Sequence, residues 1–174
     1  MAQTQAVWRL IGLALLSAGL PFWLQRPLVC MPWNHAIAPG RPDWQRVLVS
    51  VLHWAVLALW AWMAMAWIGH SLAASSLALA ARILLLLLIL AGLLLWPGYQ
   101  WQWRAHPAKS FVSRLLETVV LYFLVGVLGV AFETQLGNPF PQGWEFYAIT
   151  LCLYLVLAFP GFVYRYLLRH RARA

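Results

Sequence analysis

The chain has 174 residues, of which 64% are hydrophobic and only 9% are charged, with 12 Lys and Arg against 4 Asp and Glu. A soluble domain usually has about 25% charged residues, so this composition excludes an ordinary soluble fold and favours an integral membrane protein. The formal net charge of +8 does not indicate a nucleic-acid-binding protein, because the basic residues separate long apolar runs instead of covering one face of a soluble fold.

Five apolar segments approach the length of about 20 residues that a helix needs to cross the hydrocarbon core. In chain order they span residues 7–24, 47–68, 75–96, 111–132 and 143–166. They are continuously apolar and do not alternate, which favours membrane-spanning helices over barrel strands. We therefore predict an all-α, polytopic membrane protein whose residues 1–174 form a single membrane-embedded domain with five transmembrane helices.

Lysine and arginine gather in alternate connections between these segments, and this pattern predicts the orientation. They follow the first, third and fifth segments, at Arg26, Arg41, Arg46, Arg104, Lys109, Arg169, Arg171 and Arg173. The connections "GHSLAA" and "ETQLGNPFPQGWE" contain neither residue type. Because cytoplasmic loops of membrane proteins carry the excess of Lys and Arg, we expect the C-terminus in the cytoplasm and the N-terminus outside.

Arg82 lies inside the third segment, about 10 Å deep at a helical rise of 1.5 Å per residue. A charge at this depth is costly, and three interpretations stay open. The side chain snorkels outward to the interface, it contacts an anionic headgroup or a partner subunit, or it pairs with a carboxylate of the chain. For such an intramembrane ion pair, Glu133 at the outer end of the fourth segment is the best candidate.

Glu117 lies about two turns into the fourth segment, three residues after Arg114. Residues at this spacing are neighbours on one helix face, so we expect a local Arg114–Glu117 ion pair near the inner interface. A proton relay would need a series of such groups across the bilayer. His53 in the second segment is interpreted as a neutral histidine hydrogen-bonded to a neighbouring helix, because a metal site needs three or four ligands.

Small residues predict where helices pack closely. We expect such packing at Gly126 and Gly129 in the fourth segment and at Gly12 and Gly19 in the first, either within the chain or between copies. The sequence contains no GxSxG, no HExxH and no phosphate-binding glycine loop, and its two cysteines lie far apart. We therefore expect no catalytic residue, no metal and no cofactor, and hence no enzyme.

Several short pieces of the chain carry a family resemblance: "RLLE", "LYFLVG", "PQGWEFYA" and "FPGFVYRYL", together with the Leu-Pro-Phe turn at 20–22 that ends the first segment. In these pieces the chain resembles the small bacterial inner-membrane proteins known as domain of unknown function 2818. The resemblance implies a multi-pass protein of the bacterial inner (cytoplasmic) membrane. Because members of that family are shorter, residues 34–99 look like an inserted hairpin.

The resemblance also implies a function, because such proteins are typically encoded beside the membrane subunits of the respiratory NADH–quinone oxidoreductase. It suggests a non-catalytic accessory or assembly protein whose partners are the lipid bilayer and the membrane subunits of that complex. The alternative is a small oligomeric carrier or channel with Arg82, His53 and Glu117 along a polar path, although no inverted repeat is visible. The sequence leaves the oligomeric state and any ligand open.

Overall fold

A computed structural model describes residues 3–31, 42–70, 76–99, 109–137 and 141–168 of the chain. Its helices are α1 (Gln3–Trp23), α2 (Asp43–Ala64), α3 (Ser76–Tyr99), α4 (Phe111–Gln135) and α5 (Trp144–Val163), and π-helical turns extend α2 (η1, Met65–Gly69) and α5 (η2, Tyr164–Leu168). Within these ranges there is no strand. The prediction of an all-α chain with five membrane-length helices is confirmed.

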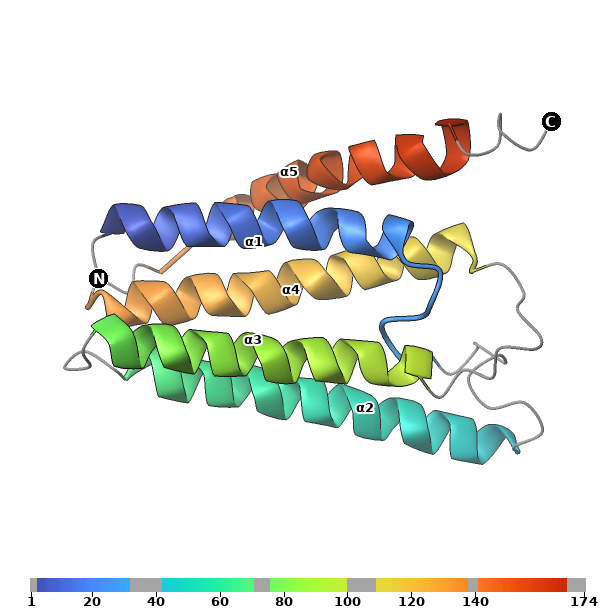
Figure 1. The fold of residues 1–174 in the computed structure, drawn as a ribbon, viewed down its shortest axis with the longest axis horizontal. Helices are drawn as coiled ribbons and strands as arrows, with labels where there is room; N and C mark the ends of the chain where they lie inside the picture. The colour runs from blue at the N-terminus through green and yellow to red at the C-terminus, as the bar shows by residue number, and fades with distance from the viewer. Residues whose placement is uncertain (1–2, 32–41, 71–75, 100–108, 138–140, 169–174) are drawn as a thin grey trace.

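Successive helices run in opposite directions along the bundle (Figure 1). At one end α1, α3 and α5 end while α2 and α4 begin. We call it the connector end, because it holds the segment Leu24–Met31 that follows α1, which we call the connector. At the opposite end, the hairpin end, η1 completes α2 and α3 begins. The chain thus begins α1 at the hairpin end and finishes α5 at the connector end.

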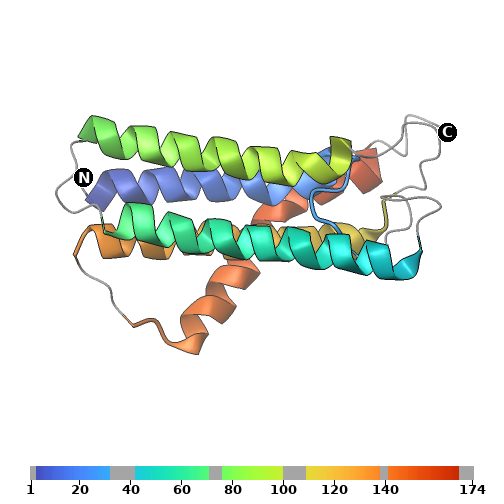
Figure 2. The same cartoon turned by 90° about the horizontal axis from the view of Figure 1, so that it is seen from below.

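The helices differ in how much of their surface other helices cover. Helix α1 packs mainly against α4 and α5, whereas α2 packs against α3 and α4. In an apolar 18-residue stretch of α4 44% of residues are buried, but only 17% in the corresponding stretch of α5. Figure 2 shows the reason, since α5 crosses the other helices obliquely and its first turns stand apart from them. Helix α4 is therefore the central helix and α5 the peripheral one.

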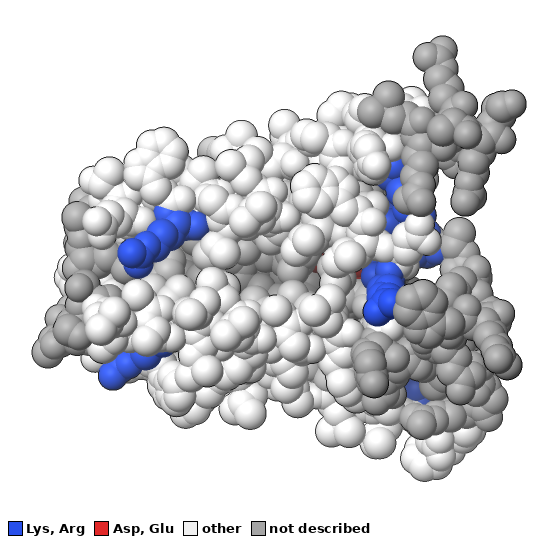
Figure 3. Space-filling model, viewed as in Figure 1, with Lys and Arg blue, Asp and Glu red and all other residues white. Residues whose placement is uncertain are grey.

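The surface of the bundle matches a lipid environment. Large apolar side chains that are about 60–70% exposed include Val51, Trp62, Leu88, Leu153 and Val156. Soluble monomers rarely expose such extensive apolar surface. On the face shown in Figure 3, the basic side chains lie towards the two ends of the bundle and uncharged surface separates them. All five helices are long and apolar enough to cross a membrane, as expected of a multi-pass membrane protein.

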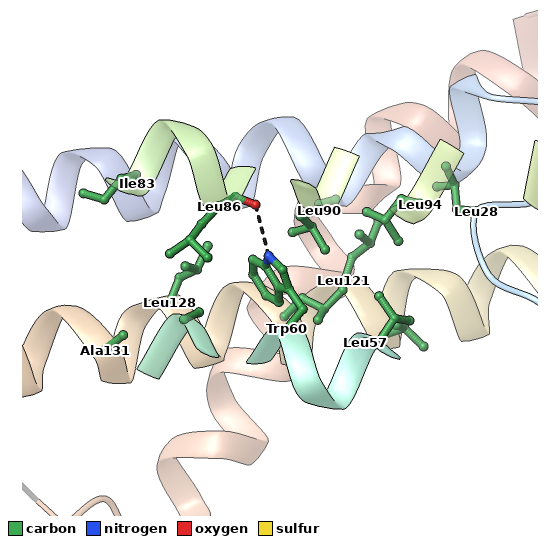
Figure 4. Close-up of a cluster of buried hydrophobic side chains, with 14 of the residues drawn as sticks. Leu28, Leu57, Trp60, Ile83, Leu86, Leu90, Leu94, Leu121, Leu128 and Ala131 are labelled. Carbon is green, nitrogen blue, oxygen red and sulfur yellow. Dashed lines mark hydrogen bonds between the residues drawn. The ribbon is translucent and has the colours of Figure 1, made fainter. Parts of the chain in front are cut away.

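A tryptophan joins three helices in the middle of the bundle (Figure 4). The side chain of Trp60 on α2 is 1% exposed, and its Nε1 donates a hydrogen bond to the carbonyl oxygen of Leu86 on α3 at 3.0 Å. Leu121 and Leu128 of α4 belong to the same cluster. Because no water is present in the hydrocarbon core to satisfy a buried N–H, the indole needs this carbonyl, and the bond ties α2 to α3.

Glycine marks the close contact between α1 and α5. A Cβ atom at Gly161 of α5 would lie 3.3 Å from the carbonyl oxygen of Gly19 and 3.1 Å from Cβ of Phe22, both on α1. Nearby, the hydroxyl groups of Ser17 and Tyr154 hydrogen-bond at 2.7 Å. The absence of a side chain at Gly161 therefore lets α5 cross α1 closely at the backbone of Gly19.

Of the other glycines predicted to lie in helix contacts, one does so within the described part of the chain and two do not. A Cβ atom at Gly129 would lie 3.2 Å from Leu10 of α1, so this glycine does lie in a helix contact. At Gly12 and Gly126 a Cβ atom would meet nothing within 4 Å. Packing within the chain is therefore not seen at these two positions among the described residues, and packing between copies stays a prediction.

Candidate functional site: a buried ion pair that holds the connector

The connector is an irregular segment whose last five residues lie inside the protein. Of its residues, Pro27, Leu28, Val29, Cys30 and Met31 are buried. Irregular backbone normally runs over the surface, because its N–H and C=O groups need hydrogen-bond partners. In this protein side chains from α2, from α4 and from Lys109, which precedes α4, provide such partners at the positions described below.

Arg114 of α4 binds the end of α1. Its side chain is buried, and Nη1 donates to the carbonyl oxygens of Pro21 at 2.8 Å, Leu24 at 3.3 Å and Phe22 at 3.4 Å. The last carbonyl groups of a helix lack partners within the helix, and a cation at this end is also favoured by the helix dipole. The guanidinium therefore caps α1 from a neighbouring helix.

Glu117 of α4 binds both the connector and the residue that leads into α4. One carboxylate oxygen, Oε1, accepts a hydrogen bond from the backbone N–H of Leu28 at 3.0 Å, while Oε2 accepts one from Nζ of Lys109. Lys109 also donates to the carbonyl oxygen of Arg26 at 3.2 Å. The side chains of Lys109 and Glu117 are 1% and 0% exposed, so this ion pair is fully enclosed.

The surroundings of Lys109 act on its pKa in two directions. Burial lowers the pKa of Lys109, and the charge and hydrogen bond of Glu117 act in the opposite direction by raising it. The neighbouring guanidiniums of Arg114 and Arg165 lower the pKa further. A buried ion pair has a desolvation cost that its partner must offset, so loss of one partner leaves an uncompensated charge.

Helices α2 and α3 close the other side of the connector. Oγ of Ser50 donates to the carbonyl oxygen of Cys30 at 2.8 Å. At the end of α3, a Cβ atom at Gly98 would lie 2.9 Å from Cβ of Arg26 and 3.4 Å from the carbonyl oxygen of Pro27. Only glycine lets α3 come this close, and the connector is thereby held from three sides.

His53 does not make the predicted hydrogen bond to a neighbouring helix within the described part of the chain. Its Nε2 is buried without a hydrogen-bond partner there. The ring instead stacks on Trp96 of α3, with 6.1 Å between the ring centroids. His53 therefore packs as an aromatic ring between α2 and α3.

The structure brings Arg114 and Glu117 into one cluster but gives them different partners from those predicted. Glu117 pairs with Lys109, and Arg114 with backbone carbonyl groups. The chain that ends α1 and forms the connector explains the difference, because it presents carbonyl groups to Arg114 and an amide to Glu117. An apolar "PLVCM" at 27–31 directly after charged Arg26 is the sequence signal that could have indicated a buried connector.

The second predicted pair, Arg82 with Glu133, is not among the ion pairs of the described residues, which are Arg46–Asp43 and Lys109–Glu117. Arg82 is exposed at the hairpin end, and its Nη1 donates to the carbonyl oxygen of Trp67 at 3.3 Å. The π-helical turn that contains Trp67 offers this acceptor closer to Arg82 than the carboxylate of Glu133. With His70, these residues line an open pocket of about 320 Å³.

No group of three or more His, Cys, Asp or Glu side chains that could hold a metal occurs among the residues that the structure describes. Cys30 is not placed to act as a nucleophile either, because burial raises the pKa of its thiol to about 11 and the thiolate is the reactive form. The cluster can therefore hold charges and backbone groups in place, and its chemistry is that of a structural clamp.

Comparison with known families gives one match. The model of a family described as "Protein of unknown function (DUF2818)" matches residues 80–169, which is just over half of the chain and confirms the resemblance found in the sequence. No curated protein and no solved structure matches. The match begins inside α3 and includes Lys109, Arg114 and Glu117, whereas the connector lies outside it. That residues 34–99 are an insertion stays a prediction.

Proposed function

The chain belongs to the DUF2818 family of proteins of unknown function, and from this premise we propose that it is a non-catalytic accessory or assembly protein of a larger membrane complex. The complex that we propose is the respiratory NADH–quinone oxidoreductase of the bacterial inner membrane. The main support is that the buried charged side chains bind backbone groups of the protein itself. Ionisable groups that work in transport face a water-filled path, whereas Lys109, Arg114 and Glu117 are buried and bind backbone groups.

Helix α5 offers the surface for such a partner. The match to the family model covers residues 80–169, in which α5 is much less buried than α4. Along α5 the exposed fractions are 61% for Ile149, 59% for Leu153, 67% for Val156 and 58% for Phe159. These side chains form an apolar face without charged residues, which suits packing against another membrane helix.

Crosslinking in native membranes tests this proposal. A photoreactive amino acid replaces Val156 on α5 or, as a control, Leu59 on α2, which is 60% exposed and lies outside the matched residues. We expect mass spectrometry to find membrane subunits of the NADH–quinone oxidoreductase attached at position 156 and not at position 59. Products that contain only this chain, or the same products at both positions, would contradict the proposal.

The proposed orientation places the connector end in the cytoplasm. The basic residues of the connections gather at this end of the bundle, for example Arg26, Arg46 and Lys109, and cytoplasmic ends of membrane proteins carry this excess. Reporters fused to the two termini should therefore report different compartments, the N-terminus outside and the C-terminus inside. Both reporters in one compartment would contradict five crossings.

One observation favours the alternative, a small oligomeric carrier or channel. Arg82 and His70 line the open pocket at the hairpin end, where an anion could enter. However, Glu117 is enclosed at the opposite end of the bundle and His53 is packed against Trp96, so the three groups first considered for a path do not share one. Anion flux into proteoliposomes that is lost in Arg82→Leu would support a carrier, and no flux would contradict it.

A further inference from the structure

The charges at the connector end do not balance. Lys109 and Arg114 both donate hydrogen bonds to the connector, and Arg165 is near enough for its charge to lower the pKa of Lys109. Glu117, which binds Lys109, is the acidic side chain among them. Three cations and one carboxylate leave an excess of two positive charges. The chain has 4 acidic side chains. The remaining ones do not reach this cluster: Asp43 pairs with Arg46, and Glu133 and Glu145 lie at the hairpin end.

Two nitrogen atoms of this cluster also lack acceptors. Nε of Arg114 and Nη1 of Arg165 are buried and have no hydrogen-bond partner among the described residues. An unpaired guanidinium N–H in apolar surroundings is unfavourable. Arg114 is 1% exposed, whereas Arg165 is half-buried, so a ligand that comes from the membrane reaches Arg165 first.

Arg165 is held in this place by aromatic packing. It lies in η2 between residues whose rings pack on other helices: Phe162 contacts Phe22 of α1 at 6.2 Å between ring centroids, and Tyr166 contacts Phe111 of α4 at the same centroid distance. The guanidinium therefore sits on a fixed element between the end of α5 and the start of α4. A site with this support is preorganised.

We propose that this cluster binds the phosphate group of an anionic phospholipid. Arg165 makes the direct contact, and the positive charges of Arg114 and Lys109 attract the phosphate from further inside the protein. A guanidinium matches a phosphate through two parallel hydrogen bonds. Lipid phosphates lie at the depth where spanning helices end, and basic pockets between such helices bind anionic headgroups. Both leaflets contain phosphates, so the site is independent of the orientation and of the respiratory partner.

Lipid retention by the purified full-length chain in mild detergent tests the site. Phosphatidylglycerol is the anionic probe, phosphatidylcholine the zwitterionic one and inorganic phosphate the free anion. Native mass spectrometry counts the retained lipids, and a thermal scan measures the shift of the unfolding midpoint. We expect preferential retention of phosphatidylglycerol and an upward shift with it, whereas inorganic phosphate at the same concentration gives neither.

The decisive variant is Arg165→Gln, and its matched control is Arg82→Gln, the same change on an exposed arginine at the hairpin end. Loss of a charged hydrogen-bond partner should weaken phosphatidylglycerol retention about tenfold in Arg165→Gln and leave it unchanged in Arg82→Gln. Equal loss in both variants, equal retention of both lipids by the unchanged chain, or full stabilisation by inorganic phosphate would overturn the proposal.

If Arg165→Gln does not fold, a variant that keeps the positive charge still tests the proposal. Arg165→Lys keeps the cation but loses the planar pair of donors, so it should retain phosphatidylglycerol over phosphatidylcholine with a several-fold smaller preference. The preference should also fall as salt rises, because partly exposed charges are screened. A preference as large as that of the unchanged chain would exclude Arg165 as the direct contact.

Discussion

The two ends of the bundle use their charges in different ways. At the connector end the side chains of Lys109 and Glu117 are about 99% and fully buried, and each also binds the backbone of the connector. At the hairpin end Arg82 is exposed and has a single long bond to the carbonyl oxygen of Trp67. In this protein the charged side chains that are buried are those that bind an irregular segment. The depth of a charge along its helix does not by itself lead to its burial.

The largest effect should follow from Glu117→Gln. The variant leaves Lys109 buried without a counter-charge, and breaking a buried pair in this way costs about 3–5 kcal/mol. Reversible unfolding in mixed detergent micelles measures the free energy of unfolding. The matched change at the other end, Glu133→Gln, should stay within about 0.5 kcal/mol, and similar losses in the two variants would remove the contrast between the ends.

Release of the connector should increase the rate at which the thiol of Cys30 is labelled. Burial raises the pKa of this thiol to about 11 from 9.0, so at neutral pH it forms roughly one hundredfold less thiolate than an ordinary cysteine. With Cys152→Ser, Cys30 is the only thiol left, and iodoacetamide labelling followed by mass spectrometry should be slow. Adding Glu117→Gln should make it fast.

The raised pKa of Cys30 also predicts how the stability of the folded state changes with pH. The thiol has a higher pKa in the folded state, so its contribution to stability is fully present below pH 9 and is lost as the pH rises towards about 11. Rapid labelling of Cys30 in the otherwise unchanged chain at pH 7.5 would show that the connector is open and would contradict the enclosed site.

Glycine substitutions compare the packing at the two ends. Gly161→Ala places a methyl group 3.3 Å from the backbone oxygen of Gly19, which cannot move alone, and should lower the free energy of unfolding by about 1–3 kcal/mol. Gly69→Ala at the hairpin end meets the side chain of Thr134, also at 3.3 Å, and this side chain can shift. We expect a smaller loss there, and none for Gly126→Ala. A larger loss at Gly69 would reverse the comparison.

The smallest effect should follow from Arg82→Gln. The side chain is exposed and loses one hydrogen bond to Trp67, which should change the free energy of unfolding by about 0.5 kcal/mol or less. Because Arg82 does not pair with Glu133 in the structure, the effects of Arg82→Gln and Glu133→Gln should add. A double-mutant cycle measures this, and a coupling above about 1 kcal/mol would establish the ion pair after all.

The five helices could be predicted from the sequence because each is marked by its own apolar residues. The partner of Glu117 could not, since Lys109 precedes α4 and reaches the carboxylate only because both residues bind the connector. Arg114 three residues before Glu117 was the simpler choice by local spacing. Likewise, a glycine in a helix does not reveal which face has a neighbour, so Gly129 and Gly126 look alike in the sequence and differ in the structure.

The close crossing of α1 and α5 has a consequence for biosynthesis. The hydrogen-bonded hydroxyl groups of Ser17 and Tyr154 are 137 residues apart in the chain, and Gly161 reaches Gly19 only at the end of α5. During translation α1 is therefore made long before α5, and the face of α1 that carries Gly19 lacks this neighbour in the meantime. A ribosome stalled before α5 would hold a nascent bundle that still lacks this crossing.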